Sequence, residues 1–135
     1  MTALAAAGNR QFKVGTVSEV PLAASVVLYK GAGVCTNAAG FAVAASDTAA
    51  LVTLGVADET VDNSAGSAGD LTCKVRRGAV HLFSTDSDLG QASVNTSIAM
   101  WADDNALDVA LNLTNDIVAG KVIEYVSSSQ VWIEV

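Results

Sequence analysis

The feature that most constrains the fold is a regular alternation of short apolar runs and turn-forming clusters. From Gln11 onward, runs rich in β-branched residues recur about every ten residues, and clusters of Gly, Asn, Asp and Ser separate them. Such runs are typical of short antiparallel strands, and none demands a long helix. The predicted strands are residues 12–17, 25–30, 33–36, 41–44, 51–57, 71–76, 79–83, 97–101, 107–110, 118–125 and 130–135. We therefore predict an all-β fold, a small single-domain β-barrel or β-sandwich.

Two local patterns predict where the chain turns. The segment from Asn37 to Gly40 fits a tight hairpin, because glycine readily takes the left-handed conformation that closes such loops. Apolar residues alternate from residue 71 to 75, but Val80 and Leu82 have the opposite parity. A bulge or bend at residues 77–78 would return this apolar pair to the buried face. Residues 58–70, 86–95 and 103–105 are predicted to be exposed loops, the first with nothing to bury.

The length of 135 residues fits a single domain. Residues 1–46 have a net charge of +2, whereas residues 47–135 have a net charge of −9. We therefore divide the chain into an extended amino-terminal arm, residues 1–13, and a β-barrel-like body, residues 14–135. The basic arm, rich in small residues, is suited to lie against another molecule, and an ordinary frayed terminus is the alternative.

The overall charge restricts the possible partners. The net charge of −7 and the pI near 4.3 argue against nucleic acid and anionic membrane surfaces, because both repel an acidic protein. No apolar run approaches the roughly 20 residues that a membrane-spanning helix needs. Residues 1–8 lack the pattern of a secretion signal, so we expect the protein to stay in the compartment where it is made.

Residues capable of catalysis are few and scattered. His81 is the single histidine, and we expect it to face the wetter side of a strand or to be satisfied by a neighbour. Asp86 and Asp88 have the spacing of a calcium loop but lack its remaining ligands. Cys35 and Cys73, with one histidine, do not supply a zinc site, and we expect both to be free buried thiols. We predict no enzyme activity, cofactor or metal.

Three aromatic residues fall in predicted strands of the carboxy-terminal third: Trp101, Tyr125 and Trp132. In a barrel rich in valine, such side chains normally anchor the core or an interface. Their alternative role is to line a carbohydrate-binding face. Solvent exposure of Trp101 and Trp132 would favour the carbohydrate alternative.

Several motifs, taken in order, resemble a known family. The chain is similar to the capsid cement, or head decoration, proteins of tailed bacteriophages over residues 26–135. The motifs that carry this resemblance are Val27-Leu28-Tyr29-Lys30-Gly31, Asn37 to Phe41, Asp47-Thr48-Ala49, Gly55-Val56-Ala57-Asp58-Glu59, Val61-Asp62-Asn63, Gly69-Asp70, Val75-Arg76-Arg77-Gly78, Ala119-Gly120-Lys121-Val122 and Val131-Trp132-Ile133-Glu134-Val135.

The resemblance implies a virion protein on the capsid exterior, made in the host cytoplasm. Such a domain would bind the major capsid protein on the expanded head, as a homotrimer, and would stabilise the lattice without catalysis. From the positive charge of the arm we infer capsid contacts at Thr2, Leu4, Arg10 and Lys13. The alternative function is a carbohydrate-binding or adhesive β module on a virion or cell surface.

Overall fold

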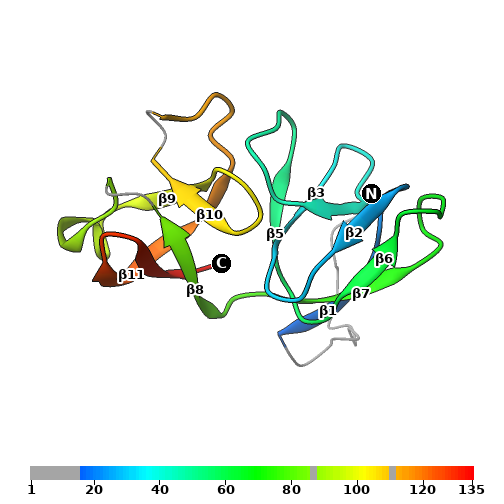
Figure 1. The fold of residues 1–135 in the computed structure, drawn as a ribbon, viewed down its shortest axis with the longest axis horizontal. Helices are drawn as coiled ribbons and strands as arrows, with labels where there is room; N and C mark the ends of the chain where they lie inside the picture. Colours follow the sequence, from blue (N-terminus) through cyan, green and yellow to red (C-terminus); the bar gives the residue numbers. More distant parts are fainter. Residues whose placement is uncertain (1–15, 86–87, 110–111) are drawn as a thin grey trace, which may run out of the picture.

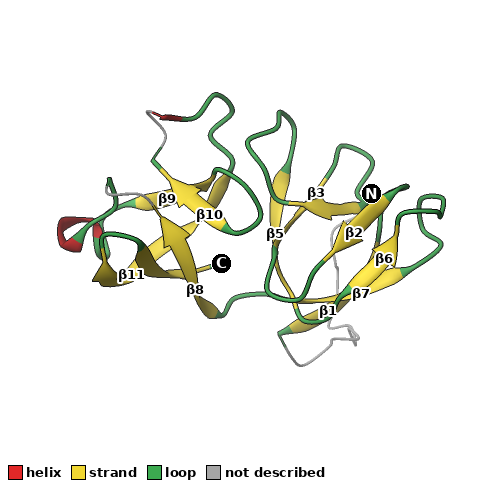
Figure 2. Cartoon of the chain, viewed as in Figure 1, coloured by secondary structure: helices red, strands yellow, loops and turns green. Residues whose placement is uncertain are grey.

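The computed structural model describes residues 16–85, 88–109 and 112–135, and they form an all-β protein (Figure 1). Strands joined by loops dominate, with only short helical turns (Figure 2). The predicted fold class is confirmed. Seven strands belong to the amino-terminal half: β1 (Val17–Pro21), β2 (Val26–Leu28), β3 (Gly33–Thr36), β4 (Ala42–Ala44), β5 (Val52–Ala57), β6 (Val61–Asn63) and β7 (Thr72–Arg76).

In the amino-terminal half, five antiparallel strands form a sheet in the order β1-β7-β5-β3-β4. A parallel bridge between Leu22 and Ala42 brings the two ends of this sheet together. Strands β2 and β6 form a separate antiparallel ribbon. The enclosed core is built from small and branched side chains: Leu22, Leu28, Val34, Ala42, Ala57, Cys73 and Val75.

The carboxy-terminal half is a small closed barrel. Its strands are β8 (Val80–Thr85), β9 (Ile98–Trp101), β10 (Ala106–Asp108), β11 (Val118–Ser127) and β12 (Gln130–Glu134), and a 3-10 turn covers Gln91–Ser93. The strand order is β10-β8-β12-β11-β9, and pairing of β9 with β10 closes the barrel. The pair β8–β10 is parallel, and the other pairs are antiparallel. Large side chains fill the interior, among them Phe83, Trp101, Val122, Val131 and Ile133.

The two halves lie side by side and share packing (Figure 1). Gly33 of β3 faces Trp101 of the barrel so closely that a Cβ on this glycine would lie 2.5 Å from the indole ring. The Gly33 amide also donates a hydrogen bond to the Asp104 carbonyl, at 2.6 Å. Cys35 and Val56 join the hydrophobic cluster of the barrel. The halves therefore meet through a continuous core.

The predicted hairpin at Asn37 is confirmed. The Asn37 amide donates to the Phe41 carbonyl at 3.0 Å, and Gly40 has a positive φ of 86°. The Asn37 side-chain oxygen accepts hydrogen bonds from the amides of Ala39 and Phe41, both at 3.0 Å. An asparagine before a positive-φ glycine thus fixes the β3–β4 connection.

The predicted bend at residues 77–78 is present, but its expected consequence is wrong. The chain leaves β7 there, crosses to the barrel and enters β8, with Gly78 at φ 66°. Val80 and Leu82 remain on the outside, 45% and 41% exposed, whereas Phe83 is buried. Because β7 and β8 belong to different sheets, the parity of one strand places no constraint on the next.

The prediction that residues 58–70 form an exposed loop with nothing to bury is also wrong in part. Residues 61–63 form β6, and Asn63 is 2% exposed. Its side-chain amide donates to the carbonyls of Ala23, at 3.0 Å, and Ser67, at 3.1 Å. A buried asparagine with both hydrogen bonds made is a stable arrangement, and it holds this segment against the body.

The predicted first strand, residues 12–17, lies mostly outside the described residues, and β1 continues to Pro21. The arm, residues 1–13, lies outside them as well, and so do its contact residues Thr2, Leu4, Arg10 and Lys13.

Candidate interaction surfaces

A threonine hydroxyl joins the two halves beneath the molecular surface. The Trp101 indole N–H donates to Thr53 Oγ1 at 2.9 Å, and the Thr53 hydroxyl donates in turn to the Val118 carbonyl. Trp101 is fully buried and meets Phe83 edge to face, with ring centroids 5.1 Å apart. Strand β5 is therefore fixed to β11 by one hydroxyl group with both of its bonding roles used.

An apolar groove lies over this bridge. Two adjoining shallow depressions of about 430 and 420 Å³ share Val118 in their walls. Val52 is 66% exposed, Ile98 is 54% exposed and Val118 is 48% exposed. We call this surface the β5–β11 groove. Its remaining lining residues are Leu51, Thr53, Asn115, Asp116, Ile117, Asn95, Thr96, Ser97, Gly120 and Lys121.

Asp47 forms hydrogen bonds at the rim of the β5–β11 groove. Its carboxylate accepts hydrogen bonds from the amides of Thr114, at 2.8 Å, and Asn115, at 2.7 Å. The Asn115 side chain returns a bond to the Asp47 carbonyl at 2.8 Å. Because these backbone amides favour the ionised form, the pKa of Asp47 is lowered from its ordinary value. Three hydrogen bonds thereby join two loops that are distant in sequence.

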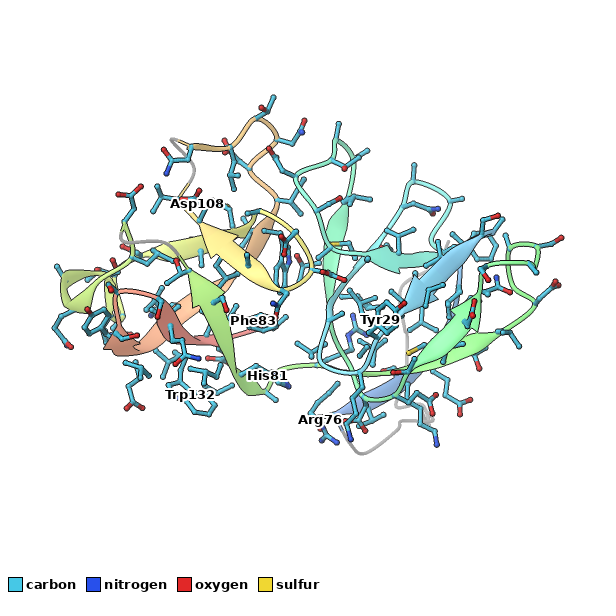
Figure 3. The ribbon with its side chains drawn as sticks, in the orientation of Figure 1. Tyr29, Arg76, His81, Phe83, Asp108 and Trp132 are labelled. Atoms are coloured by element: carbon cyan, nitrogen blue, oxygen red, sulfur yellow. The ribbon has the colours of Figure 1, made fainter. Side chains whose placement is uncertain are left out.

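A second apolar surface covers the outer wall of the barrel. Trp132 of β12 lies directly opposite Leu82 on one side and Glu124 on the other. One row along, Glu134 lies between Val80 and Lys121. We call this surface, residues 80, 82, 123, 124, 126, 132 and 134, the β8–β12 wall. Figure 3 shows Trp132 on the same side of the molecule as His81 and Arg76.

Irregular pairing in β11 enlarges this wall. The β11–β12 register shifts between Val122 and Glu124, and again between Tyr125 and Ser127. The unpaired residues are Ile123 and Val126, which are 36% and 48% exposed. A bulge turns an additional side chain outward, and here both additional side chains are apolar.

His81, the single histidine of the chain, lies in β8. It is partly buried, at a position opposite Ile133, and its Nδ1 has no hydrogen-bond partner among the described residues. Of the two expectations for His81, a place on the wetter side of the strand or a neighbour that satisfies the ring, the missing Nδ1 partner bears only on the second. Burial lowers the pKa of His81, so the ring is neutral near neutral pH.

Both described cysteines are free and buried, as predicted. Burial raises the pKa of Cys35 to about 11.

Asp86 lies outside the described residues, and Asp88 accepts a hydrogen bond from the Asn112 side chain at 2.7 Å. Within residues 16–85, 88–109 and 112–135, no three His, Cys, Asp or Glu side chains gather in a way that could hold a metal ion. In the same part of the chain, no helix is long and apolar enough to cross a membrane.

The aromatic residues separate into different environments. Trp101 belongs to the core, as predicted, and its full burial excludes it from a carbohydrate-binding face. Tyr125 and Trp132 are partly buried, with Tyr125 packed against the barrel core. The sequence did not identify either apolar surface, since both arise from strands that only the fold brings together.

Comparison with known proteins gives no relative from which a function can be transferred. No protein-family model, no curated protein and no solved structure matches the chain.

Proposed function

We propose that this protein decorates the capsid of a tailed bacteriophage. In this proposal it binds the outer surface of the expanded head, contacts the major capsid protein and stabilises the lattice. The order of motifs over residues 26–135 supports the family, and the β5–β11 groove supports a binding role. Contiguous exposed apolar surface marks sites of protein association.

The observation that carries the proposal is an exposed apolar groove whose floor and rim are held by hydrogen bonds. Its floor is fixed by the hydrogen bonds of Thr53 with Trp101 and Val118. Its rim is held by Asp47 through the amides of Thr114 and Asn115. A preorganised apolar surface loses little entropy on binding, so more of the contact free energy remains as affinity.

Electrostatics supports a place on the outside of the shell. Residues 79–135 contain eight carboxylate side chains and one cation, Lys121. A domain of this charge would be repelled by packaged DNA at close range, whereas the exterior imposes no such cost. The basic arm supplies the complement, and we propose that Thr2, Leu4, Arg10 and Lys13 contact capsid carboxylates and shallow apolar sites.

We further propose that three copies associate about a local threefold axis of the lattice. Contacts between copies would bury part of the barrel's exposed large apolar residues, which are Val80, Leu82, Ile98, Val118, Ile123 and Val126. Because such association can be weak in free solution, the copies would assemble fully only on the shell.

Cosedimentation with isolated expanded heads tests this function. Val52→Asp should weaken binding at least tenfold, or about 1.4 kcal/mol, because it places a charge in the groove. Leu71→Asp is the matched control, since Leu71 is 43% exposed and lies outside the groove. Saturated heads should also rupture at a higher temperature than bare heads. Failure of the wild-type protein to sediment with heads, or equal melting of bare and saturated heads, would refute the proposal.

A further inference from the structure

We propose that in the free protein the amino-terminal segment, residues 1–15, docks on the β8–β12 wall of its own barrel. This inference concerns the protein in solution and does not depend on capsid binding. It rests on where the described chain begins, on the charge of the wall and on the composition of the segment.

The described chain begins beside this wall. The Arg77 amide donates to the Thr16 carbonyl at 2.7 Å, so residue 16 lies at the crossing from β7 to β8. Next to it, the Gly78 amide donates to the Val135 carbonyl at 2.8 Å. Leu82 is five residues beyond Arg77, a distance of at most about 17 Å along an extended chain. Fifteen residues, with an extended reach of about 50 Å, therefore suffice to cover the wall.

The wall has an excess of negative charge: Glu124 and Glu134 stand against one cation in the strand register, Lys121, which lies opposite Glu134. Glu124 and Glu134 flank Trp132 and Val80 in the strand register, and neither forms an ion pair with a described residue. The nearby Arg76 is already paired with Asp58 at 3.2 Å. Carboxylates beside exposed apolar side chains favour an occupant that is both cationic and apolar.

The amino-terminal segment has this composition. Residues 1–15 contain two cations, Arg10 and Lys13, and no carboxylate side chain. Leu4 and Phe12 supply large apolar groups, and alanines lie between them. The segment is tethered beside the wall, so docking within one chain has a high effective concentration compared with binding by a second molecule.

Tryptophan fluorescence provides a direct test. The chain has two tryptophans, and Trp101 is fully buried, so acrylamide quenching reports mainly on Trp132. Deleting residues 2–14 should raise the quenching constant about twofold, because the partly buried ring becomes open to solvent. The buried emission of Trp101 in the same sample shows whether the truncated protein is folded.

Charge variants of the full chain test the electrostatic part. Arg10→Glu with Lys13→Glu should raise quenching as the deletion does. Lys30→Glu with Lys74→Glu changes the net charge equally at positions away from the wall, and should leave quenching unchanged. A peptide of residues 1–15, added to the truncated protein, should restore protection of Trp132.

Two results would overturn the inference. Equal quenching of the full and truncated proteins would show that the segment does not cover Trp132. Protection that appears only at high protein concentration, together with a doubled mass, would assign the wall to a second copy. Since no capsid is present in these measurements, a failure here leaves the decoration proposal to its own test.

Discussion

Replacing Thr53 by valine removes the hydroxyl that joins the two halves and changes the shape of the side chain little. In the wild type, this hydroxyl accepts a hydrogen bond from the Trp101 indole and donates one to the Val118 carbonyl. Trp101 has no exposed surface, so water cannot replace the lost acceptor. Thr53→Val therefore leaves a buried N–H group without a partner.

The magnitude follows from the burial of the indole. A buried donor left unsatisfied costs about 1–3 kcal/mol, and we assign this cost to Trp101. Thr53 is itself only partly buried, so water can reach the Val118 carbonyl and that loss adds little. Against a typical total stability of about 5–15 kcal/mol, the predicted loss is readily measured.

Urea unfolding followed by tryptophan fluorescence is the assay. Thr36→Val is the matched control, because the Thr36 hydroxyl makes one long, exposed hydrogen bond to the Val52 carbonyl, at 3.4 Å. We expect the control to lose less than about 0.5 kcal/mol. Thr53→Ser retains the hydroxyl and should recover most of the stability. If Thr53→Val and Thr36→Val agree within about 0.5 kcal/mol, the hydroxyl does not join the halves as argued.

Three further predictions concern packing, pH and thiol reactivity. Gly33→Ala should destabilise the fold by about 1–3 kcal/mol through its clash with Trp101, whereas Gly90→Ala, with open space and φ −136°, should be nearly neutral in the same unfolding assay. The pKa of Asp47 is lowered on folding, so its stabilising effect is present above its ordinary pKa of 3.8 and is lost as the pH falls through the folded pKa. The free energy of unfolding of Asp47→Asn should therefore change less between pH 5 and pH 3 than that of the wild type. Equal changes in the two proteins would contradict this reasoning. At pH 8 a thiol with a pKa of about 11 is ionised in about one molecule in a thousand. Cys35 should therefore resist a thiol reagent until urea unfolds the protein. Rapid labelling of Cys35 in the folded state would show that this thiol is not buried.

Local sequence signals predicted most strands because each depends on a few neighbouring residues. The run from Gly33 to Thr36 is found as β3 with the predicted bounds, and the adjacent hairpin follows from Asn37 and Gly40. Turn residues and β-branched runs restrict the backbone conformation locally through steric effects. Predictions based on them therefore hold without knowledge of the partner strand. The same is true of the buried Trp101, since a large ring in a valine-rich barrel normally anchors the core or an interface.

The surfaces could not be predicted in this way, because they depend on which strands become neighbours. The outward direction of Val80 and Leu82 follows from the change of sheet after β7, which no local pattern records. The bulges that expose Ile123 and Val126 depend on the β11–β12 register. Likewise, Thr53 and Trp101 are 48 positions apart in the sequence, so their hydrogen bond could not have been inferred from residue spacing.

The two proposals together lead to a final prediction. If residues 1–15 dock on their own barrel in solution, they must leave it before they can contact a capsid, and the apparent affinity falls by the fraction of free segments. With docking favoured by about 1 kcal/mol, roughly one segment in six is free. Neither Glu124 nor Glu134 lines the β5–β11 groove. Glu124→Gln with Glu134→Gln would weaken docking, so binding to heads should become up to about sixfold tighter. Asp62→Gln with Asp70→Gln removes equal charge from the other half and is the control, and tighter binding by both double variants would attribute the gain to net charge alone.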